Sequence, residues 1–181
     1  MPSSPLKVAV VCSSNQNRSM EAHRILKKRG FCVRSFGAGT SVRLPGPTPY
    51  QPNVYDFKTT YHQMYNDLLK KDEKLYTNNG VLNMLSRNKR IKPRPERFQN
   101  CRDEFDLIIT CEEKDQESLR PDTLQPVQHI HVDIQDKEIQ ATVGACQCIQ
   151  KPEDVKTKMY ELLPELEEGS RKTLLHTLCF Y

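Results

Sequence analysis

The sequence predicts an α/β fold, a three-layer sandwich whose central sheet is mostly parallel. Three apolar runs read as buried strands, at residues 7–11, 105–111 and 129–134. Segments with helical spacing of apolar residues separate the strands, and this alternation favours a parallel sheet with right-handed crossovers. A chain of 181 residues is long enough to bury one core, so we expect a single domain spanning 1–181.

The first half of the chain supplies a helix and a second strand. Residues 19–30 have helical spacing and end at Gly30, a residue that commonly stops helices. Residues 31–36 alternate apolar and polar side chains, as a strand does. Residues 41–53 contain four prolines, which predicts an irregular loop with extended, polyproline-like geometry.

The rest of the chain predicts three more helices and a closing strand. Residues 59–71 place apolar side chains on one helical face and have a threonine available as N-cap. A shorter helix at 81–90 leads into a basic, proline-punctuated loop at 91–101. Residues 152–163 begin with proline and keep helical spacing, and 172–180 predict the last strand.

Composition restricts the class of protein. Hydrophobic residues make up 36% and charged residues 28%, which is typical of a polar globular domain. The net charge of +4 suits an anionic substrate but is too small to predict nucleic-acid binding. No apolar stretch approaches the roughly 20 residues that a membrane helix needs. The first residues lack a signal-peptide pattern, and the seven cysteines lack framework spacing, so we expect an intracellular protein with free thiols.

The segment after the first strand carries the chemistry. Cys12 follows the strand, and the loop that ends at Arg18 leads into a helix. Backbone N–H groups of such a loop and the helix dipole attract a phosphate dianion, and both favour a thiolate over a thiol at Cys12. The planar guanidinium of Arg18 can hold two phosphate oxygens, and the Ser19 hydroxyl can donate to the sulfur. The predicted phosphate-binding residues are Ser13, Ser14, Asn15, Gln16, Asn17 and Ser19.

A thiolate that attacks phosphorus needs a general acid for the leaving alkoxide. Asp136 and Asp133 follow a predicted strand at the same edge of the sheet, and Asp136 is the first choice because it lies further along the loop. The non-catalytic alternative is that Cys12 is an inert, buried thiol before a polar turn. The strand before Cys12 and the helix after Arg18 favour catalysis, with an optimum at mildly acidic pH.

Several segments together resemble the RNA polymerase II C-terminal-domain phosphatases of the Ssu72 type. They are "VCSSNQNRS", "FDLIITCEE", "VDIQD" and "LLHTLCFY", and the likeness extends through 44–72 and 88–101 to almost the whole chain. The resemblance implies a fold like that of low-molecular-weight protein tyrosine phosphatases. It assigns Cys12 as nucleophile, Arg18 as phosphate ligand and Asp136 as acid, with a cysteinyl-phosphate intermediate and neither metal nor cofactor.

The same resemblance implies a substrate and partners. The substrate would be phosphoserine followed by a cis proline in the polymerase heptad repeat, chiefly the serine at the fifth position. The protein would act in the nucleus with symplekin and the cleavage and polyadenylation machinery, in transcription termination and mRNA processing. A cis Ser-Pro substrate needs an apolar wall beside the phosphate loop. The candidates for this wall are Pro45, Pro47, Leu82 and Met84, and the alternative role of each side chain is ordinary packing.

Some features depart from the family pattern. The segments near 112–127 and 141–148 are shorter than expected, and Pro164 falls where a helix should continue. The alternative is therefore a weakly active or inactive paralogue that binds the phosphorylated tail or the processing complex without turnover. A displacement of about 1 Å in a catalytic group can cost around a hundredfold in rate.

Three other patterns add little to this interpretation. The basic run at 87–97 is either a solvated loop or a surface that attracts an anionic tail or directs nuclear import. The pairs His129 with His131 and Cys146 with Cys148 lack the spacing of metal sites, so we expect no metal. A redox role for the loop cysteine lacks an adjacent resolving thiol.

Overall fold

The computed structural model describes residues 6–111, 126–132 and 174–180. The helix predicted at 152–163, Pro164, the two candidate acids and nearly all of the shortened segments fall outside these ranges. The Cys146 and Cys148 pair does so as well. The structure therefore describes side chains as well as backbone for residues 6–111, and the backbone alone for the strands at 126–132 and 174–180.

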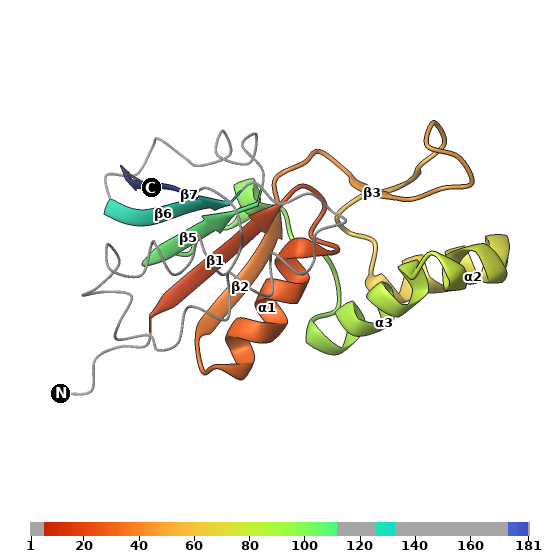
Figure 1. The fold of residues 1–181 in the computed structure, drawn as a ribbon, viewed down its shortest axis with the longest axis horizontal. Helices are drawn as coiled ribbons and strands as arrows, with labels where there is room; N and C mark the ends of the chain where they lie inside the picture. The colour runs from red at the N-terminus through yellow and green to blue at the C-terminus, as the bar shows by residue number, and fades with distance from the viewer. Residues whose placement is uncertain (1–5, 112–125, 133–173, 181) are drawn as a thin grey trace.

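The central sheet has five strands in the order β2-β1-β5-β6-β7 (Figure 1). Neighbouring strands from β2 to β6 run parallel, as predicted, whereas β7 runs antiparallel to β6. The sheet is thus mostly parallel with one antiparallel edge. The strands are β1 (Lys7–Cys12), β2 (Cys32–Gly37), β5 (Leu107–Thr110), β6 (Pro126–Val132) and β7 (Leu174–Phe180).

The described residues contain three α-helices. One lies against the sheet and two extend away from it (Figure 1). The predicted helices are confirmed as α1 (Arg18–Lys28), α2 (Tyr61–Asn78) and α3 (Val81–Ile91). Helix α2 begins at a capping box between Thr60 and Gln63, and it runs past the predicted end because Asp72 caps its second half after a kink. Gly80 separates α2 from α3 with φ of 81°, a left-handed conformation that glycine adopts without strain.

The proline-rich segment is more regular than predicted. Val42–Leu44 forms β3 and Asn53–Tyr55 forms β4, and the two pair antiparallel as a separate small sheet. The prolines of this segment fall between the two strands, where they interrupt no ladder hydrogen bond. The expectation of an irregular loop over the whole of 41–53 was therefore wrong at its ends. A 3₁₀ turn at Phe98–Asn100 interrupts the later basic loop.

The two faces of the sheet are covered by different parts of the chain. His23 of α1 bonds to Ser35 of β2 (Nδ1 to Oγ, 2.8 Å), so Ser35 points toward α1. The next residue, Phe36, points to the other face, where its ring meets Phe98 and Phe105 edge to face at 5.3 and 5.8 Å. Helix α1 therefore covers one face of the sheet (Figure 1), and the segment before β5 covers the other.

A second apolar core joins α2 and α3 to the rest of the molecule. Fully buried side chains of both helices pack against β3 and the start of α1. This packing fixes α3 beside the N-terminus of α1, where the loop after β1 ends (Figure 1). The buried members of this second core are Met20, Val42, Leu44, Tyr61, Met64, Leu68, Tyr76, Val81, Leu82 and Leu85.

None of the helices in the described ranges is both long enough and apolar enough to cross a membrane.

Candidate active site

The loop between β1 and α1 forms one wall of a cavity of about 570 Å³. Cys12 is the last residue of β1 and Arg18 is the first of α1, so the sheet and the helix fix the two ends of the loop. Both side chains line the cavity, although only 3% of Cys12 and 2% of Arg18 is exposed. The predicted nucleophile and the predicted phosphate ligand are therefore brought to the same small space.

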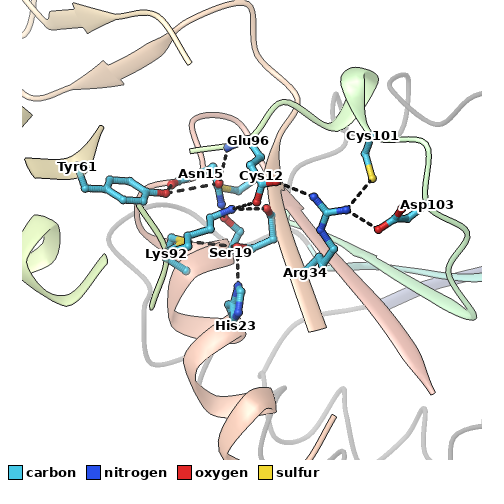
Figure 2. Close-up of polar contacts among 12 residues, drawn as sticks. Cys12, Asn15, Ser19, His23, Arg34, Tyr61, Lys92, Glu96, Cys101 and Asp103 are labelled. Atoms are coloured by element: carbon cyan, nitrogen blue, oxygen red, sulfur yellow. Dashed lines mark hydrogen bonds and ion pairs between the residues drawn. The ribbon is translucent and has the colours of Figure 1, made fainter. Parts of the chain in front are cut away.

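Ser19 lies next to the thiol, and Asn15 lies next to Ser19 (Figure 2). The Cys12 Sγ is 3.0 Å from Ser19 Oγ, and Asn15 Nδ2 donates to the same Oγ at 2.9 Å. Since the serine oxygen accepts from Asn15, its own hydrogen is available to the sulfur. The Ser19 hydroxyl is thus placed to donate a hydrogen bond to the Cys12 sulfur.

Asn15 also organises the middle of the loop. Its φ of 54° is left-handed, a conformation that asparagine tolerates better than most residues. Its carbonyl accepts from the buried hydroxyl of Tyr61 at 2.7 Å, and its Oδ1 accepts from the backbone N–H of Glu96 at 3.0 Å (Figure 2). One residue of the loop thus ties together α1, α2 and the segment after α3.

Helix α3 holds the end of the loop. Arg87 Nη2 donates to the carbonyls of Gln16 and Asn17 at 3.0 and 3.3 Å, and Asn88 Nδ2 donates to that of Gln16 at 2.8 Å. Arg87 Nη1 in turn binds Glu21 of α1 at 2.9 Å. These contacts form a bridge from α3 to both the loop and the first turn of α1.

The end of β2 holds the start of the loop. The backbone N–H groups of Ala38 and Gly39 donate to the carbonyls of Cys12 and Ser13 at 2.8 and 2.9 Å. A Cβ at Gly39 would lie 2.9 Å from the Ser13 oxygen, so this close approach requires glycine. The loop is thereby bonded through its carbonyls to the chain after β2, to α2 and to α3.

This bonding pattern sets the direction of the backbone amides. No described peptide is cis, and in a planar trans peptide the N–H points opposite to the C=O. The carbonyls of Asn15, Gln16 and Asn17 point to Tyr61 and Arg87, so the N–H groups that follow them point the other way. Successive N–H groups and the start of α1 then form a concave, partly positive surface of the kind suited to a phosphate.

Charges around the loop are paired and largely buried. Burial opposes ionisation of Glu21, but hydrogen bonds and charge from Arg24 and Arg87 outweigh it and leave the pKa of Glu21 below its usual value. Burial lowers the pKa of Arg87. Behind the loop, burial lowers the pKa of Lys92 to about 8, against the opposing effect of Glu96. Lys92 Nζ donates to Glu96 at 2.9 Å.

The predicted apolar wall is only partly at the cavity. Pro45 and Met84 line it, together with Leu44 and Val81. Leu82 belongs to the core between α2 and α3, because its position on α3 turns it inward. Pro47 is not among the lining residues. Besides these apolar groups, the cavity is lined by Arg43, Asn79 and Gly80.

Sequence reasoning missed the residues that hold the loop from outside. Tyr61, Arg87 and Asn88 lie more than 40 positions away in the chain, and no motif connects them to the loop. The candidate acids Asp133 and Asp136 lie outside the described residues. In the described part of the chain, no group of three metal-ligating side chains comes together.

Comparisons with known proteins identify the family. A family model described as "Ssu72-like protein" matches residues 6–181. The SSU72 phosphatases of the RNA polymerase II C-terminal domain from Homo sapiens and Gallus gallus are each 66% identical to this chain, with both chains covered completely. The aligned region spans 194 residues against 181 here, so this chain is shorter than these relatives.

Solved structures of the same family are similar to this chain over nearly its whole length. The Drosophila melanogaster serine phosphatase of the RNA polymerase II CTD is 43% identical, with a TM-score of 0.82 over 97% of this chain and 100% of that one. D. melanogaster Ssu72 with symplekin and a cis peptidomimetic of a CTD peptide phosphorylated at its fifth-position serine is 42% identical. Its TM-score is 0.83, over 98% of this chain and 100% of that one. This chain belongs to the Ssu72 family.

Proposed function

We propose that this chain is a cysteine-dependent protein phosphatase that removes phosphate from serine in the C-terminal domain of RNA polymerase II. The observation that carries the proposal is the convergence of Cys12 and Arg18 on one cavity, with the buried Ser19 hydroxyl bonded to the thiol and the loop carbonyls held from outside. The relatives that bear this activity by name match the chain over its full length.

The reaction proceeds in two displacements. The Cys12 thiolate attacks phosphorus, an S–P bond forms, and the P–O bond to the serine breaks. Asp136 gives its proton to the leaving alkoxide, with Asp133 as the alternative donor. A water then attacks phosphorus, the S–P bond breaks, and the same carboxylate accepts the water's proton. Arg18 and the loop amides neutralise the charge on the phosphoryl oxygens in both steps.

We propose that the substrate is the fifth-position serine of the heptad repeat, followed by a proline in cis. The Drosophila Ssu72 structure with such a peptidomimetic supports this choice. Pro45 and Met84 offer an apolar surface in the cavity against which a proline ring can pack. The whole chain, 1–181, would act as one domain in the nucleus with symplekin and the cleavage and polyadenylation complex.

The second candidate is a binding module without turnover, favoured by the shorter length of this chain relative to its relatives. A phosphorylated heptad peptide separates the two. We expect wild type to release phosphate and the Cys12→Ser variant to bind the peptide without releasing any. If neither protein releases phosphate while both bind the peptide, the binding module is correct.

The acid can be assigned with the same peptide. Because the thiolate must be charged and the acid protonated, we expect a bell-shaped rate with a mildly acidic optimum. Asp136→Asn should slow phosphoserine hydrolysis by about a hundredfold or more and have little effect on p-nitrophenyl phosphate, whose leaving group needs no proton. Asp133→Asn should retain the rate. The reverse pattern would assign the acid to Asp133.

A further inference from the structure

Three hollows lie in succession along the edge of the molecule where β1 and β2 end. The first is the catalytic cavity. The second, of about 280 Å³, shares Ser13, Ser14 and Arg43 with the first and extends to Gly39. The third is a cleft of about 300 Å³ between β2 and the segment after α3. Arg97 lines this cleft and donates from Nε to the Gly39 carbonyl at 3.1 Å, so the second and third hollows meet at this contact.

The third hollow, here called the basic cleft, has a positive balance of charge. Its lining includes Arg34, Lys58, Arg94 and Arg97 but a single acid, Glu96. That acid is already shared, because it pairs with Arg34 at 2.6 Å and with Lys92 behind the cleft.

Three cations of the basic cleft have no acidic partner among the described residues. Arg34 also pairs with Asp103, which leaves its charge fully matched. Lys58 and Arg94 are exposed and make no ion pair within the described ranges, and Arg97 uses only Nε in its contact with Gly39. Within the described part of the chain, the uncompensated charge of the cleft is therefore carried by Lys58, Arg94 and Arg97. The lining of the cleft also includes the apolar side chains of Phe36, Phe57 and Pro95.

We propose that the basic cleft binds a second phosphate of the substrate chain, on a residue some positions away from the phosphoserine in the catalytic cavity. The inference rests on the proposed function and adds a specificity site to it. The peptide would run from the catalytic cavity past Arg43 to Lys58, Arg94 and Arg97. Apolar side chains of the peptide would pack against Phe57 and Pro95. Once one phosphate is bound, the second binds intramolecularly at high effective concentration.

The expected effect is on substrate affinity and not on the chemical step. Each exposed cation contributes little alone, but several acting on one dianion should lower KM about tenfold for a doubly phosphorylated peptide. The gain should shrink as salt rises from low to physiological concentrations, because exposed charges are screened over about 8–10 Å. The turnover number should be the same for both peptides.

The test uses the full chain and a series of heptad peptides, each with one phosphoserine alone or with a second phosphate at increasing spacing on either side. The variant is Lys58→Gln/Arg94→Gln, since neither side chain has another role in the described structure. The matched control is Lys28→Gln/Arg29→Gln, two exposed cations at the far end of α1. Hydrolysis of p-nitrophenyl phosphate, which fills only the catalytic cavity, reports on folding and chemistry.

We expect wild type and the control to show a lower KM for the doubly phosphorylated peptide at one preferred spacing, and the cleft variant to lose this preference. All three should hydrolyse p-nitrophenyl phosphate equally. Equal KM values for singly and doubly phosphorylated peptides at every spacing would overturn the inference, as would a preference that survives in the cleft variant.

Failure of the proposed function is distinguishable from failure of the inference. If wild type releases no phosphate from any peptide, the proposed activity fails. Binding of the same peptides to Cys12→Ser, measured by fluorescence anisotropy with and without the Lys58→Gln/Arg94→Gln changes, then decides the cleft by itself. Tighter binding of the doubly phosphorylated peptide that the two changes abolish supports the cleft, and equal binding refutes it.

Discussion

Ser19 Oγ lies 3.0 Å from Cys12 Sγ and accepts a hydrogen bond from Asn15 at 2.9 Å. The asparagine thereby orients the hydroxyl so that it donates to the sulfur. In the proposed reaction this contact would stabilise the thiolate twice, as attacking nucleophile and as leaving group when the intermediate is hydrolysed. It joins the end of β1 to the first turn of α1 across the loop between them.

Removing the Ser19 hydroxyl should weaken the nucleophile without unfolding the chain. A hydrogen bond to a charged group contributes about 1.5–3 kcal/mol, so Ser19→Ala should lower kcat roughly ten- to a hundredfold. Alkylation of Cys12 by iodoacetamide at mildly acidic pH should slow in parallel. Unchanged alkylation and turnover would show that the serine does not stabilise the thiolate.

Arg87 is predicted to be a positioning residue that acts through the loop carbonyls. Arg87→Met should lower kcat about ten- to a hundredfold, because a shift of about 1 Å in the loop misplaces the phosphate. The KM for a phosphopeptide should change less. Arg90→Met is the matched control, since Arg90 is exposed on the same helix and contacts only the carbonyl of Ser86.

A second substitution separates positioning from stability. Arg87→Met also leaves the buried Glu21 carboxylate with Arg24 as its remaining ion-pair partner, which should destabilise the fold. Adding Glu21→Gln should restore much of the midpoint of thermal unfolding but not kcat. If both recover together, Arg87 acts only on stability.

The hydroxyl of Tyr61 is predicted to fix the middle of the loop. Tyr61→Phe leaves the buried Asn15 carbonyl without this donor, at a cost of about 1–3 kcal/mol in the free energy of unfolding and with a lower kcat. Tyr65→Phe on the same helix is the control, because the Tyr65 ring contacts Lys89 and keeps that contact without its hydroxyl. Denaturant unfolding and steady-state kinetics measure the two effects, and equal behaviour of the two variants would argue against this role.

His23 should make stability depend on pH between about 4 and 6.5. Burial first, and then the charges of Lys92 and Lys27, lower the pKa of His23 to about 4, although Glu96 opposes the shift. Below pH 6.5 the unfolded chain therefore binds a proton that the folded chain does not. The free energy of unfolding should fall as pH drops through this window, by up to about 3 kcal/mol.

Urea unfolding at a series of pH values measures this loss. The carboxyl groups with lowered pKa values, such as Glu21 and Glu96, lose their contribution at lower pH than His23 does. His23→Gln should flatten the curve between pH 4.5 and 6.5 while retaining the fall below it. A wild-type curve that is flat over that range would contradict the buried, neutral imidazole.

The sequence was sufficient for the parts of the fold that local patterns determine. Apolar runs located β1 and β5, and the spacing after Thr60 located α2, because burial of one face imposes those periods. The loop cysteine and arginine could be read from their position between a strand and a helix. The antiparallel direction of β7 could not be read from the sequence, because it depends on the end of the sheet from which the chain enters the strand and not on the strand's own residues.

The outer support of the loop was equally hidden from the sequence. Arg87 belongs to a run of basic residues that reads as a solvated loop, yet tertiary packing of α3 turns it toward Gln16 and Glu21. Leu82 and Met84, both on the predicted short helix, were expected at the substrate wall, but the two positions point in different directions and only Met84 lines the cavity. Contacts between distant segments decide both cases.

The central claim is that the Cys12 sulfur becomes covalently bonded to the phosphate. Rapid acid quenching of wild type with a phosphorylated heptad peptide, followed by mass spectrometry of the digested protein, tests it directly. We predict a phosphate adduct on the peptide that contains Cys12, absent from the Cys12→Ser variant, which should release no phosphate. Continued phosphate release by Cys12→Ser, with no adduct on the wild-type cysteine, would contradict the account.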